Sequence, residues 1–151
     1  MSTIAEEIKQ GKFKSVQHES SVNILFTASF LNLKHAQFFK EYSLTPPQFN
    51  VLRILRGQHG QSISVCNIMD RMIDKSSNAS RIIDKLVQKK LVYRTVSRHD
   101  RRAVDVIISE NGLSLLQLID NEENRLMDGV NLLSNEEAKT LNLLLNKVRN
   151  S

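Results

Sequence analysis

The stretch from residue 74 to residue 108 constrains the fold more than any other part of the chain. Residues 74–86 read Asp-Lys-Ser-Ser-Asn-Ala-Ser-Arg-Ile-Ile-Asp-Lys-Leu, which separates into an apolar and a polar face at helical spacing. Two short apolar runs follow, at 91–96 and 103–108, and the second alternates as a half-buried hairpin strand does. The basic sequence Arg98-His-Asp-Arg-Arg102 lies between them. This order predicts an amphipathic helix followed by a β-hairpin with a charged tip.

Positive charge is concentrated in the same region. Residues 71–104 carry 10 basic and 3 acidic side chains, whereas residues 1–70 have a net charge of +2 and residues 105–151 a net charge of −4. A positive segment between near-neutral and acidic ones is typical of a surface that binds a polyanion. A solvated charged face is the alternative interpretation, and the coincidence of the charge with the helix and hairpin favours nucleic acid.

Capping signals and apolar spacing predict further helices on both sides of this unit. A long helix is expected over about 17–42, and Thr45-Pro-Pro-Gln48 has the form of a capping box that opens a second helix. Ser64 is the expected cap of a third, shorter helix, and the fourth is expected over about 76–90. After the hairpin, Ser109 should begin a long helix whose apolar face includes Leu116, Ile119, Met127 and Val130, and a second capping box at Ser134 should open the last helix.

The predicted order is four helices, two strands and two helices, a mostly α fold with a small β-hairpin wing (α+β). This is a winged helix-turn-helix with long helices at both ends, and 151 residues suffice for one such domain. The terminal helices carry more apolar surface than a small winged domain can cover. We therefore expect a homodimer in which a second copy of the chain buries that surface.

The polar face of the fourth helix predicts the residues that contact duplex DNA. The start of such a helix reaches base edges in the major groove, and the candidates there are Ser76, Ser77, Asn78, Ser80, Arg81 and Lys85. Contacts to the DNA backbone, which fix position without reading sequence, are expected from Lys75, Lys89, Lys90 and Arg94. The wing candidates are Arg98, His99, Asp100, Arg101 and Arg102. Asp100 is placed to bond Arg102 two residues on, and a held arginine suits a narrow minor groove. A simple turn with solubilising charge is the alternative for the wing.

Several other classes of protein are disfavoured. The longest apolar runs fall short of the ~18 residues of a membrane span, residues 1–10 lack the apolar core of a signal peptide, and a single cysteine fits a reducing cytoplasm. The histidines His18, His35, His59 and His99 lack the paired spacing of a zinc site. No glycine-rich phosphate loop or converging catalytic set is apparent, so we expect no enzyme activity, no cofactor and no metal.

Three segments together resemble the MarR family of bacterial winged-helix regulators: residues 44–55, residues 76–91, and Asp100-Arg-Arg-Ala-Val-Asp-Val-Ile-Ile-Ser-Glu-Asn-Gly112. The resemblance covers nearly the whole chain. It implies a cytoplasmic homodimer with a winged lobe at about 43–109 and dimerisation helices at about 1–42 and 110–151. It also implies a pseudo-palindromic operator, with Arg102 in the minor groove and Asp100 orienting it. Family members commonly repress transcription until a small molecule, often a phenolic or other aromatic acid, binds between the dimer helices and the DNA-binding lobes.

Regulation is where the sequence leaves alternatives open. Phe26, Phe30 and Phe49 are candidate lining residues of a pocket for an aromatic ligand, although aromatic residues at helical spacing more often pack against one another. Cys66 lies near the start of the third predicted helix, a position at which a helix dipole can lower the pKa of a thiol. We nevertheless expect a small buried cysteine there and not a redox sensor. A redox-responsive regulator using Cys66, and a winged helix that binds a protein or RNA, are the alternative functions.

Overall fold

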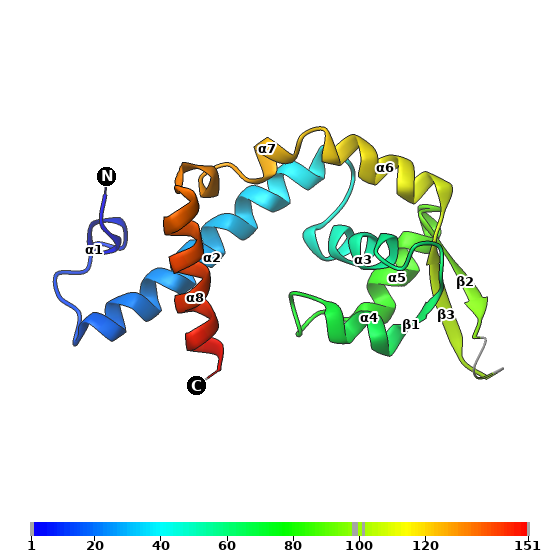
Figure 1. Ribbon diagram of the computed structural model, residues 1–151, viewed down its shortest axis with the longest axis horizontal. Helices are drawn as coiled ribbons and strands as arrows, with labels where there is room; N and C mark the ends of the chain where they lie inside the picture. The colour runs from blue at the N-terminus through cyan, green and yellow to red at the C-terminus, as the bar shows by residue number, and fades with distance from the viewer. Residues whose placement is uncertain (1, 98–99, 101, 151) are drawn as a thin grey trace.

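The computed structural model describes residues 2–97, 100 and 102–150 of the chain (Figure 1). The elements are, in chain order, α1 (Ile4–Glu7), α2 (Val16–Lys40), α3 (Pro46–Arg56), β1 (Ile63–Ser64), α4 (Val65–Arg71), α5 (Ala79–Gln88), β2 (Val92–Val96), β3 (Val104–Ile108), α6 (Glu110–Asp120), α7 (Glu123–Leu126), the 3-10 helix η1 (Val130–Leu132) and α8 (Asn135–Arg149). The predicted mostly α fold with a small β-hairpin wing is therefore confirmed.

The chain forms a lobe and an extended stalk. We call α3, α4, α5, α6 and the sheet the lobe; the stalk is α1, the N-terminal half of α2, and α8. In Figure 1 the lobe lies to the right and both termini lie in the stalk to the left. A connector, residues 121–134 with α7 and η1, runs from the lobe back along α2 to α8 (Figure 1).

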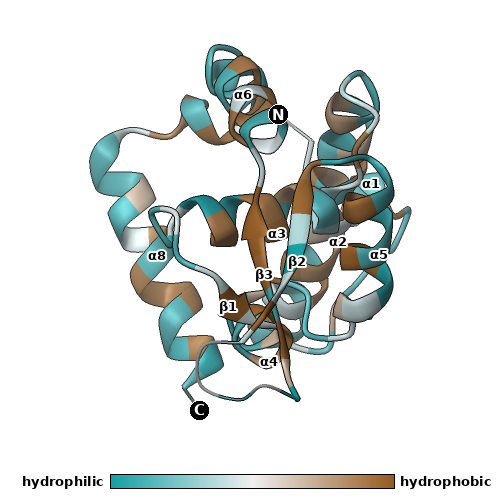
Figure 2. Cartoon of the chain, turned by 90° about the vertical axis from the view of Figure 1, so that its right-hand side faces the viewer, coloured by the Kyte–Doolittle hydropathy of each residue, from teal (hydrophilic) through white to brown (hydrophobic). Residues whose placement is uncertain are grey.

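A single apolar core holds the lobe together. Fully buried side chains come from every layer of it: Val51 and Leu52 of α3, Ile68 of α4, Ile83 and Leu86 of α5, Val92 and Val106 of the sheet, and Leu116 of α6. Figure 2 shows this concentration of apolar residues on α3 and β3 in the middle of the lobe. Because each helix turns an apolar face inward, its polar face is left on the surface.

The sheet has three antiparallel strands in the order β1-β3-β2. Its first strand was not predicted, because two residues are too short to show a two-residue period. Ser64 of β1 pairs with Asp105, which lies on the central strand β3. The simple alternation of apolar and polar residues in 103–108 does not predict burial at both of these positions: Asp105 is only 6% exposed, with Ser62 Oγ 3.4 Å from its carboxylate, whereas Val104 is 47% exposed.

The prediction of one long helix after Ser109 is wrong, because the helix is interrupted twice. Ser109 does cap α6, but α6 ends at Asp120, α7 is a single turn, and Gly129 has a φ of +92°. Leu116 and Ile119 are buried as predicted, while Met127 and Val130, beyond the break, are exposed. The break lets residues after Asp120 turn toward α2, where long-range contacts replace the helical ones.

Candidate nucleic-acid interface

The helix-turn-helix is built from α4 and α5, and each is capped by a side chain. Ser64 Oγ accepts from the amide of Asn67, and Asn78 Oδ1 accepts from the amide of Arg81 at 3.1 Å. The second helix therefore begins at Ala79 and not near Ser76 as predicted. The Asn78 side-chain oxygen accepts the capping hydrogen bond, and the side-chain amino group remains as a donor to a base or phosphate.

The turn before α5 is held rigid by its own side chains. Asp74 Oδ1 accepts from the Ser76 amide at 2.9 Å and from Ser76 Oγ at 2.6 Å. Hydrogen bonds from Ser76 and Ser77 hold the pKa of the Asp74 carboxyl below its ordinary value. Asn50 of α3 fixes the turn from the other side, since its Oδ1 accepts from the amide of Ile73 at 2.9 Å. The two serines thus lie in a fixed turn at the N-terminus of α5.

The outer face of α5 is polar and exposed. Ser80, Arg81 and Lys85 are exposed there, while Ala79, Ile83 and Leu86 on the opposite face are buried. Within the described part of the chain, the Arg81 guanidinium makes no ion pair with an acidic side chain. A planar, doubly donating group is therefore presented to solvent near the start of the helix.

The residues predicted to contact the DNA backbone differ in their surroundings. Lys75 Nζ contacts the backbone carbonyls of Met69 and Asp70 at the end of α4, and Lys89 Nζ contacts the carbonyl of Ser43 and lies 3.1 Å from Gln48 Oε1. Arg94 of β2 forms an ion pair with Asp84 of α5. All four residues are exposed. Lys75, Lys89 and Arg94 also join elements of the lobe to one another, and the Lys90 carbonyl accepts from Ser109 Oγ.

The wing consists of β2, β3 and the segment between them. Of the predicted wing residues, Arg98, His99 and Arg101 lie outside the described residues, and Asp100 and Arg102 are exposed. Asp100 Oδ1 accepts from the Arg102 backbone amide at 2.8 Å, and the Asp100 carbonyl accepts from Ala103. Asp100 therefore bonds Arg102 as predicted, but through the backbone amide; among the described residues no ion pair joins its carboxylate to the Arg102 guanidinium, so the predicted hold on the arginine side chain is not seen.

A pocket of about 340 Å³ lies at the junction of α3 with α6 and α7. It is lined by Phe49, Arg53, Arg56, Ile119, Asp120, Glu123 and Leu126. Arg56 is bonded to both carboxylate oxygens of Asp120, at 2.5 and 3.2 Å, and the Arg53 guanidinium carbon lies 5.9 Å from the centre of the Phe49 ring. The sequence reasoning selected Phe49 but missed both arginines, whose spacing of three residues on α3 was the available signal.

The other two aromatic candidates lie elsewhere. Phe26 and Phe30 lie on α2, 39% and 47% exposed, and do not line this pocket. Phe49 is 8% exposed and stacks on Phe39 with ring centroids 4.2 Å apart. Phe49 therefore both lines the pocket and packs into the core.

Cys66 is exposed on α4, so the expectation that it is buried was wrong. Ile68, two residues on, occupies the core position, which turns Cys66 outward. The described residues contain no group of three or more His, Cys, Asp or Glu side chains that could hold a metal ion. None of the described helices is both long and apolar enough to cross a membrane.

Known proteins match this chain in sequence and in fold. The MarR family profile matches residues 44–104, which include α3 to β2. The HTH-type transcriptional regulator MhqR of Bacillus subtilis is 29% identical over 109 residues, covering 72% of this chain and 74% of that protein. The structure of MepR of S. aureus in complex with DNA has a TM-score of 0.74 at 22% identity, covering 86% of this chain and 96% of that one.

The organohalide-sensing regulator RdhR in its 2,4-dichlorophenol-bound form has a TM-score of 0.78 at 19% identity, covering 93% of this chain and 86% of that one. The curated relatives are transcriptional regulators and not enzymes. The winged lobe, the three-stranded sheet and these matches agree: residues 44–104 match the MarR family, and the chain is similar in sequence to HTH-type transcriptional regulators and in fold to MarR-like ones.

Proposed function

We propose that this protein binds a pseudo-palindromic operator as a homodimer and represses transcription until a small aromatic ligand releases it. The observation that carries the proposal is the pairing of an exposed polar face on α5 with a wing in which Asp100 Oδ1 accepts from the amide of Arg102. Both lie in the segment of the chain where positive charge is concentrated. That combination suits simultaneous contact with a major groove and an adjacent minor groove.

In this proposal each residue class has its own part. Ser77, Ser80 and Arg81 at the start of α5 reach base edges, because the first turn of a recognition helix enters the major groove. Lys85 and Lys90 contact phosphates and set register without reading sequence. Arg102 inserts into the minor groove, where a narrow groove concentrates negative potential.

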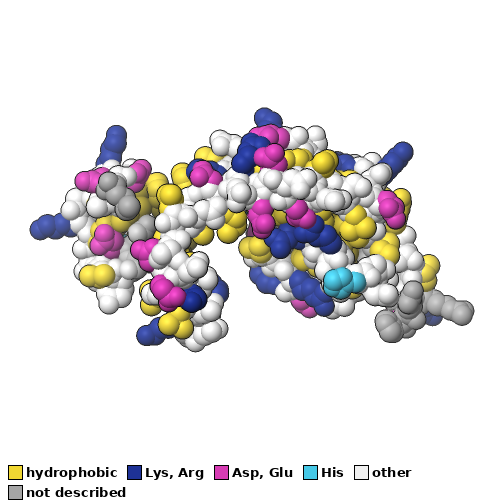
Figure 3. All heavy atoms as spheres, turned by 45° about the horizontal axis from the view of Figure 1, so that its top comes forward, with side chains coloured by type: hydrophobic (Ala, Val, Ile, Leu, Met, Phe, Trp, Pro, Cys, Tyr) yellow, Lys and Arg dark blue, Asp and Glu magenta, His cyan; other side chains and the backbone are white. Residues whose placement is uncertain are grey.

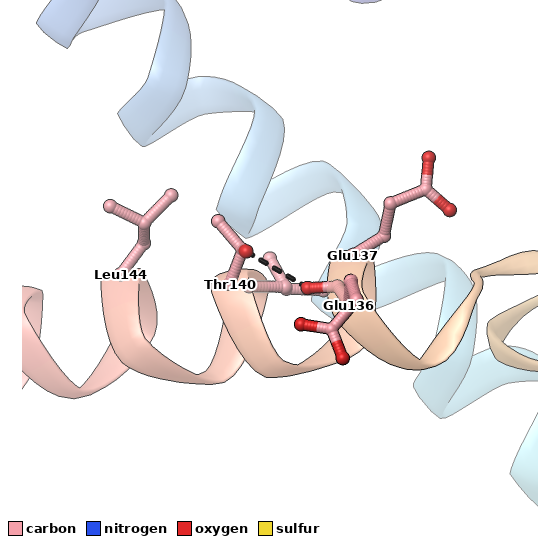
Figure 4. Close-up of a pocket in the computed structure, with 5 residues that line it drawn as sticks. Glu136, Glu137, Thr140 and Leu144 are labelled. Atoms are coloured by element: carbon pink, nitrogen blue, oxygen red, sulfur yellow. Dashed lines mark hydrogen bonds between the residues drawn. The ribbon is translucent and has the colours of Figure 1, made fainter.

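The homodimer is supported by apolar surface left open on the stalk. Leu25 and Leu33 of α2 and Leu141, Leu144 and Val148 of α8 are all exposed in the single chain. Leu141 and Leu144 also line a hollow of about 380 Å³ on α8 with Glu136, Glu137 and Thr140. Leu144 and Thr140 point to the same side of the helix, and Thr140 Oγ1 is bonded to the Glu136 carbonyl (Figure 4). Such a surface is costly to leave in water, and a second copy would cover it.

We expect light scattering at micromolar concentration to give twice the chain mass of 17.3 kDa. Leu144→Asp should shift the population to monomer and weaken DNA binding at least tenfold, because a buried unpaired carboxylate costs several kcal/mol. The matched control is Leu118→Asp, since Leu118 of α6 is 58% exposed against 54% for Leu144 but lies on the lobe. A mass of one chain for the wild type, or equal masses for the two variants, would contradict the dimer.

The ligand is supported by the chemistry of the pocket between α3, α6 and α7. Arg53 and Phe49 together offer a cation and an aromatic ring to a carboxylated or phenolic aromatic molecule. A structural neighbour has been solved with 2,4-dichlorophenol bound, which supports the same ligand class here. Because the pocket lies where the lobe meets the connector, a bound ligand would contact both parts of the chain.

The decisive experiment is selection of bound duplexes from random DNA, repeated with a panel of benzoates and phenols. We expect paired half-sites about 10 bp apart, or a multiple of that, and affinity that falls steeply with salt. At least one aromatic acid should release the selected duplex, and Arg53→Gln should abolish that response while preserving DNA binding. Failure to enrich any duplex would overturn the proposal and favour a protein or RNA partner. Release that is unchanged in Arg53→Gln would remove the pocket assignment.

A further inference from the structure

Two routes connect the lobe with the stalk. The first is α2 itself, whose last turns place Phe38 and Phe39 in the core of the lobe. The second leaves the lobe at Asp120, passes through the connector with α7, and reaches α8. A change in the angle between the lobe and α8 that moves residues 121–128 must alter how those residues lie against α2. Contacts between α2 and α7 can therefore influence the angle between the lobe and α8, which contacts inside the lobe cannot do.

Two ion pairs join α2 and the connector, and we call them the α2–α7 clamp. Arg125 bonds both carboxylate oxygens of Glu41, at 2.7 and 3.1 Å, and Lys34 Nζ lies 2.7 Å from Asp128 Oδ2. Arg125 also lies 3.3 Å from Glu122, and its guanidinium carbon is 5.2 Å from the centre of the Phe38 ring. Figure 3 shows acidic and basic side chains side by side in the middle of this face of the molecule.

The spacing of the clamp gives it control of orientation as well as position. Lys34 and Glu41 are seven residues apart on one helix, which separates them by about 10 Å along the axis. Two attachment points at that distance resist rotation of the connector in a way that one cannot. Between them His35 Nε2 lies 3.2 Å from the Leu126 carbonyl, to which it donates when that nitrogen carries the proton. A bidentate arginine–carboxylate pair adds a directional constraint of its own.

The clamp is charged at neutral pH. The hydrogen bond from Arg125 holds the pKa of the Glu41 carboxyl below its ordinary value, and that from Lys34 does the same for Asp128. A lowered folded-state pKa means that the carboxylates remain ionised until the solution is more acidic than a free carboxyl would require. The clamp is therefore closed near neutral pH and opens only as the pH falls through those lowered pKa values.

We propose that Arg125 is a positioning residue for DNA recognition: by closing the α2–α7 clamp it fixes the angle between the lobe and α8, and so the half-site spacing that the protein accepts. Arg125 contacts no base or phosphate in this scheme. The consequence for DNA rests on the proposed homodimeric operator binding, whereas the fixed angle is a property of the single chain.

The angle can be measured without DNA by using the one native cysteine. Cys66 lies exposed on α4 in the lobe, and Lys147→Cys places a second label on α8. Spin labels on both, diluted with excess unlabelled protein, report the distance within one chain by pulsed electron resonance. We expect a narrow distance distribution with Arg125 present and one about twofold wider in Arg125→Gln, because the connector can then move about its hinge residues. Lys139→Gln, which breaks the exposed Lys139–Glu136 pair on α8 with the same loss of charge, should leave the width unchanged.

A second variant and a DNA readout separate positioning from simple stability. Glu41→Gln should widen the distribution as Arg125→Gln does, and the double variant should add little. The preference for the selected spacing is the ratio of its affinity to that for an operator with one base pair inserted or removed at the centre. Arg125→Gln should lower this ratio by about threefold, a size that is consistent with the loss of exposed ion pairs. Unchanged widths in both variants would overturn the clamp. A wild-type protein that selects no duplex would instead refute the proposed function and leave the distance result standing.

Discussion

Replacing Arg102 with alanine should lower the affinity for the selected operator by roughly two orders of magnitude or more. Each specific arginine contact contributes about 1–3 kcal/mol, and the proposed dimer would present two wings. The fold should survive, because the Arg102 side chain is exposed and only its backbone amide is bonded to Asp100. Alanine keeps that amide and therefore the turn. Fluorescence anisotropy with a labelled operator at fixed salt measures the loss, and thermal unfolding checks the fold.

The loss must be separated from a general reduction of positive charge. Arg149→Ala removes the same charge from the last turn of α8, far along the chain from the wing, and should change affinity only slightly. Asp100→Ala should fall between the two, because it frees the amide of Arg102 and loosens the tip without removing the guanidinium. If Arg102→Ala and Arg149→Ala bind the operator equally well, the assignment of the wing is wrong.

Much of the fold could be predicted because its signals are local. Thr45, Ser64, Ser109 and Ser134 all cap the helices predicted for them, since a cap depends on a side chain and an amide only three residues away. The hairpin and the buried face of α5 follow from short periodic patterns in the same way. The predicted site residues on α5 and in the wing are grouped by two adjacent elements, which is why sequence reasoning could place them together.

What sequence could not predict depends on contacts between distant segments. Glu41 and Arg125 are separated by 84 residues, and neither carries a local signal that it pairs with the other. The start of α5 shifted because Asp74 competes for Ser76 and leaves Asn78 as the cap. Lys89 stays a predicted phosphate contact, but its contacts with Ser43 and Gln48, more than 40 residues away in the chain, could not be predicted from charge. The charge pattern predicts where an interface lies, whereas the contacts of each charged side chain depend on how distant segments pack.

Gly112 lies where the base of the wing meets α6. The backbone of α6 comes so close to the hairpin there that no side chain fits between them. A Cβ at this position would be 2.4 Å from the Leu91 carbonyl oxygen and 2.7 Å from Ile108 Cγ1. The same place is fixed by Ser109, whose Oγ accepts from the Gly112 amide at 3.0 Å and donates to the Lys90 carbonyl at 2.8 Å. A methyl group therefore cannot be accommodated by a rotamer change, because one of the atoms it meets is backbone.

Gly112→Ala should accordingly lower the free energy of unfolding by about 1–3 kcal/mol, even though alanine favours a helix by up to ~1 kcal/mol over glycine. Gly57→Ala is the matched control: its nearest neighbours would be 3.4 and 3.6 Å away, its φ is −64°, and alanine there should be neutral or slightly stabilising. Urea unfolding of both variants measures the difference. Since α6 would be pushed from the base of β2 and β3, operator affinity should fall as well in Gly112→Ala and not in Gly57→Ala. Equal unfolding midpoints for the two variants would mean that α6 can withdraw from the hairpin without cost, and that the wing is not braced by this contact.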